Sequence, residues 1–278
     1  MGILRLCLRL ILLVLCLVSM GITLYFAPLG VLWVRRPGSL GKKLIWFRAS
    51  IMKVHLKVFG WVAGLRIERN GVELPKKQPF LLLSNHISYL DIIAIGSLWP
   101  VGFIAKEEIR SWFFLGGLAQ RSNAIFVGRQ SVEKRVVALR ELMRVLEYLP
   151  FCVFPEGTTT ALDTPTQDQW FRGNIVVGKR PGVPIYAVGL HYRNQKAQAW
   201  IDDDGLLPHL CRALQQPTID LSVYVCPLSV RDGARPLSSM VLEAYQETVR
   251  ACHQARQRAP WTLYNTRIQD FADDSALT

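Results

Sequence analysis

The chain has 278 residues; half are apolar, 19% are charged, and the formal net charge is +12. This apolar content excludes an intrinsically disordered chain, and the length allows one large domain or two smaller ones. Residues 1–77 hold 13 basic and two acidic side chains (13 − 2 = +11), whereas residues 78–278 hold 20 and 19 (20 − 19 = +1). Because nucleic-acid-binding domains usually carry their basic surface on the folded body, we expect a membrane-facing segment and no nucleic-acid partner.

The first predicted element is a long helix without charges. Residues 10–34 are 25 uncharged residues, which as a helix span about 37 Å and can cross a hydrocarbon core of about 30 Å. The run is too long for a signal-peptide core, and no small-x-small cleavage site ends it. Five basic residues follow it between 35 and 48, against two before it, which predicts that the rest of the chain is cytosolic. We expect residues 1–36 to form a transmembrane anchor. A re-entrant hairpin is the alternative, because Pro28 and Gly30 can bend or end the helix.

An amphipathic helix and a linker are predicted over residues 37–74. From Leu40 to Trp61, seven apolar residues recur at spacings of 4, 3, 4, 3, 4 and 3, which is the period of a helix with one apolar face. The nearby lysines lie mostly off this stripe. Two interpretations stay open: the stripe packs on the protein core, or it enters the membrane interface while the lysines contact anionic headgroups. Both hold if the helix shares this face between the bilayer and the domain.

The rest of the chain alternates strands and helices. Short apolar runs predict strands at 80–83, 101–105, 124–127, 151–154, 185–190 and 219–226. Helical patterns cover 131–149, with Ser131 as N-cap and Glu133 in the first turn, and 237–258. This alternation predicts an α/β fold, a largely parallel central sheet flanked by helices, preceded by the N-terminal transmembrane or interfacial helical anchor. Ligands of such sheets bind beyond the carboxyl ends of the strands, so polar motifs just after a strand are candidate sites.

Several common types of site are missing from the sequence. It has no G-x-S-x-G, G-x-G-x-x-G, Walker A or H-E-x-x-H motif, which argues against an ordinary serine hydrolase, a nucleotide enzyme and a zinc protease. Its six cysteines are scattered without C-x-x-C spacing, as expected for small apolar side chains in a reducing compartment. We therefore expect neither a metal site nor a bound cofactor.

The first candidate segment follows the predicted strand 80–83 and contains His86 and Asp91. A histidine that takes a proton from a hydroxyl needs an acceptor on its other ring nitrogen, which fixes the tautomer and stabilises the imidazolium. Residues five apart on one helix point about 140° apart. The pair can therefore meet only if His86 precedes a helix and Asp91 lies inside it, with Ser84 or Asn85 as a candidate cap. The alternative is a histidine at a helix start and an unrelated aspartate.

Two further segments also follow strands. Arg129 comes after the strand 124–127, where an arginine suits an anionic substrate group. The alternative is a surface arginine paired with Glu133. In residues 151–160 a proline breaks the strand, Glu156 follows, Gly157 permits positive φ or a close backbone approach, and three threonines supply hydroxyls and N–H groups.

Together these segments resemble the signature blocks of the membrane-bound glycerolipid acyltransferases, the family of 1-acyl-sn-glycerol-3-phosphate acyltransferase. The N-H-x4-D block is 85–91, the strand ending in arginine is 124–129, F-P-E-G-T is 154–158 and V-P-I is 183–185, in family order. The resemblance covers roughly residues 75–235 and implies an acyltransferase domain over 75–278. It implies transfer of a fatty acyl group from acyl-CoA or acyl carrier protein to lysophosphatidic acid, which makes phosphatidic acid. It also implies membrane lipids as partners and, in a bacterium, a site on the cytosolic face of the inner membrane.

The resemblance also suggests roles for individual residues. His86 is expected to act as the general base, and Asp91 is expected to orient it and stabilise its charge. Asp204 and His209 show the reversed spacing, for which we expect a structural role. The expected substrate-binding residues are Lys106, Arg129, Glu156, Gly157, Thr158, Thr159 and Arg172.

One position departs from the family pattern. Members that make phosphatidic acid usually have an arginine after F-P-E-G-T, where this chain has Thr159. Threonine here looks more like branches that acylate larger lysolipids, such as lysophospholipids and lyso-ornithine lipid, and residues 200–214 also resemble those branches. If the acceptor carries a bare phosphate, Arg129 or Arg172 would have to replace the missing arginine. A non-catalytic membrane adaptor of the same fold is a further alternative, which predicts damage to the His86–Asp91 pair.

Overall fold

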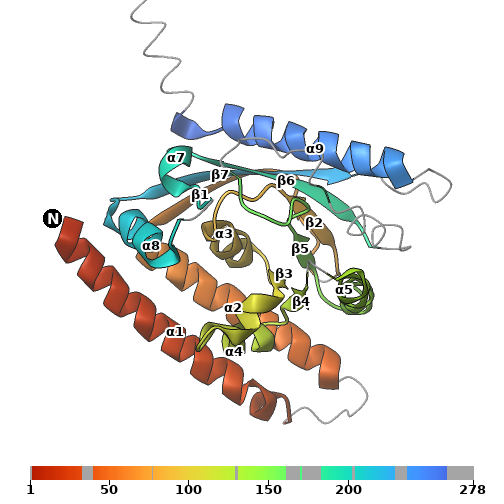
Figure 1. Cartoon of the computed structure of the whole chain (residues 1–278), viewed down its shortest axis with the longest axis horizontal. Coiled ribbons are helices and arrows are strands. Elements are labelled where there is room, and N and C mark those ends of the chain that lie inside the picture. Colours follow the sequence, from red (N-terminus) through yellow and green to blue (C-terminus); the bar gives the residue numbers. More distant parts are fainter. Residues whose placement is uncertain are drawn as a thin grey trace, which may run out of the picture.

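A seven-stranded sheet forms the centre of the protein (Figure 1). The computed structural model describes residues 2–32, 40–76, 78–128, 131–160, 170, 183–201, 204–228 and 237–261. The strand order is β1-β7-β6-β2-β5-β3-β4, and every neighbouring pair is parallel except β6 and β7. The strands are β1 (Leu65–Gly71), β2 (Leu81–Ser84), β3 (Gly102–Lys106), β4 (Ile125–Val127), β5 (Phe151–Val153), β6 (Ile185–Tyr192) and β7 (Ile219–Leu228).

Helices cover both faces of this sheet. In Figure 1, α9 lies on one face and α3 on the other, with α2 and then α1 lying progressively further out. Leu81 and Leu83 of β2 belong to one buried cluster and Leu82 to another, as the alternation of a strand between two helix layers requires. The helices are α1 (Gly2–Leu32), α2 (Leu40–Ala63), α3 (Leu90–Leu98), η2 (Glu107–Ser111), α4 (Leu115–Arg121), α5 (Val132–Val145), α7 (Gln195–Gln198), α8 (Leu206–Gln215) and α9 (Leu237–Gln257).

The predicted α/β architecture is confirmed, and each of the six predicted strands is present within two residues of its expected ends. Ser131 caps α5 as expected, since its Oγ accepts a hydrogen bond from the N–H of Lys134 at 3.3 Å, although the helix ends at Val145 and not at 149. The seventh strand, β1, was not predicted, because its residues were assigned to a linker. Only Leu65 and Ile67 in it are apolar, and it lies at the edge of the sheet beside β7.

Most of the apolar stripe of α2 lies on the outside of the protein. The core side of the helix carries other residues, such as Ala49 and Leu56, which are buried. The stripe residues Phe47, Val54 and Val58 are exposed, and Trp61 is 76% exposed. Ile51 of the same stripe is half-buried against the cluster of Met20, Leu24 and Leu118. The stripe is therefore shared between the protein interior and an exposed surface.

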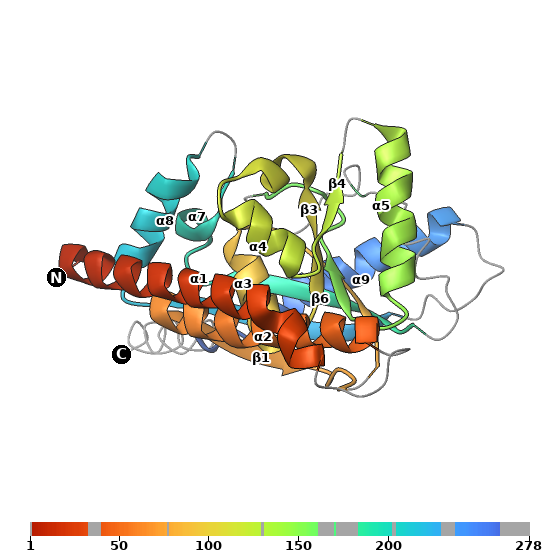
Figure 2. The same ribbon diagram turned by 90° about the horizontal axis from the view of Figure 1, so that it is seen from below.

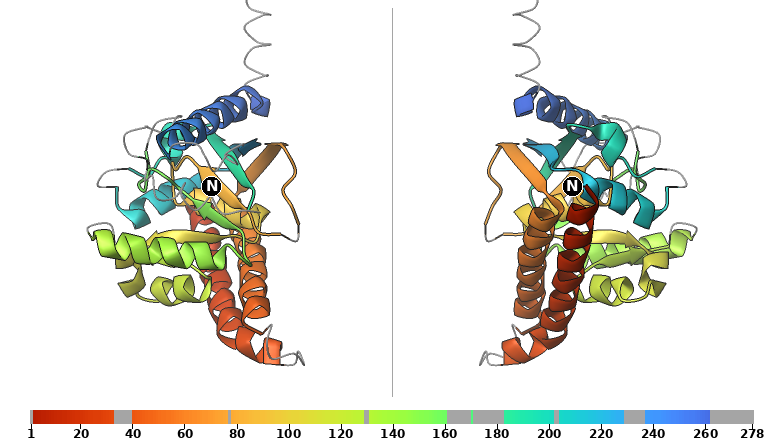
Figure 3. Two further views of the ribbon diagram at one scale, coloured as in Figure 1. Left: turned by 90° about the vertical axis from the view of Figure 1, so that its right-hand side faces the viewer. Right: turned by 90° about the vertical axis from the view of Figure 1, so that its left-hand side faces the viewer.

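The first helix lies along the body of the protein, as Figures 2 and 3 show. Residues Gly2–Phe26 are long and apolar enough to cross a membrane. The helix is continuous to Leu32, so Pro28 and Gly30 lie inside it and do not end it. It packs against α2 along its length, against α8 near its start and against α4 near its end.

Two arginines fasten the start of α1 to the end of α8. Arg9 donates to three backbone carbonyls, those of Leu214 at 2.9 Å, Gln216 at 2.6 Å and Pro217 at 3.0 Å. Arg5 donates to the carbonyl of Gln215 at 2.8 Å. The last carbonyls of a helix have no partner inside it and carry the negative end of its dipole, so a guanidinium is well placed there. We call these contacts the α1–α8 clasp.

Candidate active site

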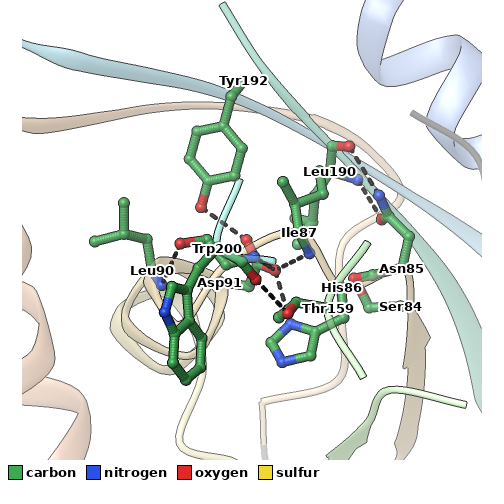
Figure 4. A network of polar contacts seen from close by, with 11 residues as sticks. Ser84, Asn85, His86, Ile87, Leu90, Asp91, Thr159, Leu190, Tyr192 and Trp200 are labelled. Carbon is green, nitrogen blue, oxygen red and sulfur yellow. Dashed lines mark hydrogen bonds and ion pairs between the residues drawn. The ribbon is translucent and has the colours of Figure 1, made fainter. Parts of the chain in front are cut away.

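The histidine and the aspartate of the first candidate segment are hydrogen-bonded to each other (Figure 4). His86 lies in the segment between β2 and α3, and Asp91 lies in the first turn of α3. The distance from His86 Nδ1 to Asp91 Oδ2 is 2.8 Å. A carboxylate only accepts, so Nδ1 carries a proton, and in the neutral form of this ring Nε2 has the lone pair. The His86 side chain is 14% exposed and Asp91 is buried, so a substrate can reach the ring but water is excluded from the carboxylate.

Four donors hold the carboxylate of Asp91. Its Oδ2 also accepts from the backbone N–H groups of Ile87 at 2.6 Å and Ser88 at 2.9 Å, and its Oδ1 accepts from the hydroxyl of Tyr192 at 2.7 Å. Burial, and then the charge of Asp91, raise the pKa of Tyr192 well above its ordinary value, so the hydroxyl stays protonated as a donor. These bonds stabilise the charged carboxylate and fix its position.

The expected cap of α3 was wrong. The N-cap position is Tyr89, which makes no side-chain cap hydrogen bond. The hydroxyl of Ser84 donates to the carbonyl of Asn85, and Asn85 instead joins β6. Its amide donates to the carbonyl of Leu190 at 3.1 Å, and its Oδ1 accepts from the N–H of Leu190 at 2.9 Å. Asn85 thus continues the β2–β6 pairing by one residue and anchors the backbone just before His86.

An aromatic ring stacks on the histidine. The ring of Phe154, which begins the F-P-E-G-T block, lies 3.9 Å from the His86 ring, centroid to centroid, with an angle of 13° between the planes. Phe103 of β3 stacks behind Phe154 at 6.3 Å. No role was predicted for Phe154, although its place just after a buried strand is the signal that identifies it. The stack restricts the orientation of the imidazole.

The loop after Phe154 is bound to the same segment. Gly157 has a φ of +69°, as expected for a position where only glycine is unstrained. The N–H of Thr160 donates to the carbonyl of His86 at 2.8 Å, and the hydroxyl of Thr159 donates to the carbonyl of Trp200. The N–H of Trp200 in turn donates to the carbonyl of Ile87 at 3.0 Å. Three segments far apart in the sequence are thus tied together around His86.

The structure describes some of the predicted substrate-binding residues and not others. Glu156 is buried in this loop, Thr158 is exposed on it, and Lys106 is the exposed last residue of β3. Because β2, β5 and β3 are parallel neighbours, Lys106 lies at the same edge of the sheet as His86. Arg129 and Arg172 lie outside the described residues.

His209 has a structural role, as predicted. The ring is 1% exposed; its Nε2 donates to the carbonyl of Ala199 at 3.1 Å and its Nδ1 accepts from the hydroxyl of Tyr89 at 3.0 Å. Asp204 pairs with Arg212 at 3.1 Å and not with His209. Chiefly burial, and then the charge of Arg212, lower the pKa of His209 below its ordinary 6.5.

This lowered pKa predicts a pH-dependent stability. The unfolded chain takes up the proton of His209 first as the pH falls, so the contribution of the neutral ring is full above about pH 6.5 and is lost below it. We expect the Tm of the wild type to fall more steeply from about pH 7 to about pH 5 than that of His209→Gln. Differential scanning calorimetry measures both slopes. His253→Gln, at an exposed position of α9, serves as the control with an unchanged slope, and equal slopes for wild type and His209→Gln would contradict the prediction.

Comparisons with known proteins show which sequences this chain is similar to. Residues 66–190 match the family model described as Acyltransferase. The chain is 35% identical over 144 residues to the lyso-ornithine lipid O-acyltransferase of Pseudomonas aeruginosa, covering 50% of this chain and 55% of that protein. It is 31% identical over 199 residues to the 1-acyl-sn-glycerol-3-phosphate acyltransferase of Neisseria gonorrhoeae, covering 68% of this chain and 74% of that protein.

A solved structure shares the fold. The crystal structure of the 1-acyl-sn-glycerophosphate acyltransferase PlsC from Thermotoga maritima superposes with a TM-score of 0.63 at 18% identity, covering 93% of this chain and 99% of that one. The matching part of this chain spans little more than half the length of the Pseudomonas aeruginosa relative.

Proposed function

Because the chain belongs to the acyltransferase family, we propose that it transfers a fatty acyl group from a thioester to the free hydroxyl of a membrane lysolipid. The observation that carries this proposal is the 2.8 Å hydrogen bond between His86 Nδ1 and the buried carboxylate of Asp91. It leaves a proton acceptor, Nε2, on a ring that is partly exposed at the carboxyl end of the sheet, where ligands of such folds bind.

In the proposed reaction, His86 Nε2 removes the proton of the lysolipid hydroxyl. The oxygen attacks the thioester carbonyl carbon, the new ester C–O bond forms, and the C–S bond breaks. The thiolate leaves and takes up the proton that His86 received. Asp91 stabilises the imidazolium between these steps. No acyl-enzyme is required, because a thiolate is a good leaving group.

We propose acyl-CoA or acyl carrier protein as the donor, with no bound cofactor. For the acceptor there are two candidates. Lysophosphatidic acid is supported by the Neisseria relative and would yield phosphatidic acid in phospholipid biosynthesis. A larger lysolipid, such as lyso-ornithine lipid, is supported by the Pseudomonas relative and by Thr159, whose hydroxyl is bonded to the Trp200 carbonyl and supplies no cation for a phosphate.

Acyl transfer to a panel of lysolipids tests the proposal. Radiolabelled acyl-CoA and acyl carrier protein are each incubated with lysophosphatidic acid, lyso-ornithine lipid and a lysophospholipid, and the lipid products are separated. We expect a diacylated product from at least one pair. Absence of transfer from either donor to any of the acceptors, by a folded protein in lipid or detergent, would refute the proposed activity.

Placing an arginine at position 159 is expected to shift the preference toward lysophosphatidic acid. A guanidinium there can form charge-assisted hydrogen bonds with the phosphate, so the ratio of kcat/KM for lysophosphatidic acid to that for lyso-ornithine lipid should rise about tenfold in Thr159→Arg. Thr160→Arg adds the same charge one residue away and is the matched control. An unchanged ratio in Thr159→Arg would contradict the proposed importance of this position.

We further propose that α1 and α2 attach the protein to the membrane. From Ile3 to Phe26 the exposed side chains of α1 are apolar or aromatic except for Ser19, and the stripe of α2 ends in the exposed Trp61. The clasp holds the start of α1 on α8 and α4 packs near its end, which favours a helix lying in one leaflet over one that crosses the bilayer away from the domain. The net charge of +11 in residues 1–77 is attracted to the anionic headgroups of the cytosolic leaflet, which supports a site on the cytosolic face, at the inner membrane in a bacterium.

Removing two large apolar side chains from this surface is expected to weaken membrane binding. Burial of each side chain in the membrane contributes about 1.5–3 kcal/mol. The double variant Val58→Ser with Trp61→Ser should therefore lower the partition constant of the protein between water and vesicles more than about tenfold. Cosedimentation with phospholipid vesicles measures this. Val137→Ser, at an exposed position on α5, is the control and should bind as the wild type does. Unchanged binding of the double variant would contradict the assignment of the surface.

A further inference from the structure

An apolar groove lies between α1 and α4, two helices that pack against each other in Figures 1 and 2. Its volume is about 430 Å³, and its walls are almost entirely apolar. The residues of its α1 wall are themselves exposed and belong to the surface that we assign to the membrane. The residues used below are Val18, Ile22 and Tyr25 on α1 and Phe114, Gly117 and Arg121 on or beside α4.

One arginine lines this groove, and a second lies close enough for their charges to interact. The guanidinium of Arg121 lies over the ring of Tyr25, 5.6 Å from its centroid. The Nε of Arg48 on α2 is buried and has no hydrogen-bond partner in the structure. Burial, and then the charge of Arg121, lower the pKa of Arg48. Among the described residues neither arginine forms a salt bridge with a carboxylate.

A strained aromatic loop borders the same groove. Phe114 has a φ of +63°, which is unfavourable for a bulky residue. Its ring reaches α1 at Gly21, where an added Cβ would lie 3.3 Å from it. The preceding Phe113 is 98% exposed. Exposed aromatic side chains are typical of the membrane–water interface, so the groove opens where lipids are present.

We propose that this groove binds an anionic phospholipid, with an acyl chain along α1 and the phosphate against Arg121. Two like charges held close together, one of them partly buried, are unfavourable unless an anion joins them. A phosphate accepts two parallel hydrogen bonds from a guanidinium. The apolar walls select a lipid over a free anion, because a free phosphate would leave them uncovered. This site is separate from the proposed acyl transfer and lies on other helices.

Calorimetric titration of the full chain in detergent with dihexanoyl-phosphatidylglycerol tests the site. We expect saturable binding that dihexanoyl-phosphatidylcholine does not reproduce and inorganic phosphate does not displace. Arg121→Gln should weaken it about tenfold, the effect of losing one charge-assisted hydrogen bond. Arg48→Gln should weaken it less than this, because it removes only the neighbouring charge. Arg140→Gln, which removes the same charge from an exposed position of α5, is the matched control and should leave the affinity unchanged.

Two further variants test whether the groove itself binds the lipid and whether this site is independent of acyl transfer. Gly117→Phe places a ring in the groove, because the nearest atom to an added Cβ is a guanidinium nitrogen 3.6 Å away, and should abolish binding with the charges intact. His86→Ala should bind the lipid like the wild type, so loss of acyl transfer and loss of this site are told apart. Equal affinity for the two lipids, an equal effect of Arg140→Gln, displacement by phosphate, or wild-type affinity of Gly117→Phe would each overturn the proposal.

Discussion

Replacing His86 with alanine is expected to lower kcat by about 10²–10⁴-fold, the usual contribution of a general base. The lysolipid hydroxyl would then have to lose its proton to water, whereas the binding surfaces for donor and acceptor would persist. KM should therefore change little. The measurement is initial-rate kinetics with the donor and acceptor found in the panel.

The fold should survive this substitution. His86 supplies one of the four donors to Asp91, and the two backbone N–H groups and Tyr192 remain. Circular dichroism and the Tm check this point. His253→Ala, at an exposed position of α9, is the matched control and should retain full activity. A folded His86→Ala protein with near wild-type kcat would show that another group removes the proton.

Replacing Asp91 with asparagine is expected to damage both activity and stability. The amide can present the wrong hydrogen-bonding group to the imidazole and cannot stabilise its charge, so kcat should fall by about 10³–10⁴-fold. It also replaces a buried carboxylate that accepts from four donors. The free energy of unfolding should fall by about 2–4 kcal/mol, measured by urea denaturation.

A double-mutant cycle separates the two roles of Asp91. If it acts only through His86, the His86→Ala and Asp91→Asn effects on kcat are not additive, because they remove one unit. Tyr192→Phe removes one hydrogen bond from Asp91 and nothing from His86, and should lower the free energy of unfolding by about 1–2 kcal/mol. Additive losses of kcat in the double variant would place Asp91 outside the proposed His86 mechanism.

Local patterns in the sequence predict most of the fold. Six of the seven strands lie in short, mostly apolar runs, which explains why they were found. The edge strand β1 has only two apolar residues and was missed. The apolar stripe of α2 is visible in the sequence, but what contacts that stripe is not. The helix is apolar on two sides, and periodicity does not say which side the protein core covers.

The candidate site also has local features that the sequence predicts and long-range contacts that it does not. His86 and Asp91 are five residues apart, so the requirement that a helix begin between them is visible in the sequence. Tyr192 lies 101 residues beyond Asp91, and its hydrogen bond depends on the pairing of β2 with β6, which no local pattern contains. The cap of α3 was misassigned because Asn85 bonds to Leu190, a partner 105 residues further along the chain.

The α1–α8 clasp has a consequence for biosynthesis. Arg9 binds carbonyls that lie 205–208 residues further along the chain. At about 5–20 residues per second, a ribosome needs roughly 10–40 s to supply them after Arg9 has been made. Throughout that interval the long apolar helix α1 exists without its contact with α8, so we expect its capture by a nascent-chain targeting factor or by the bilayer itself to precede the folding of the domain.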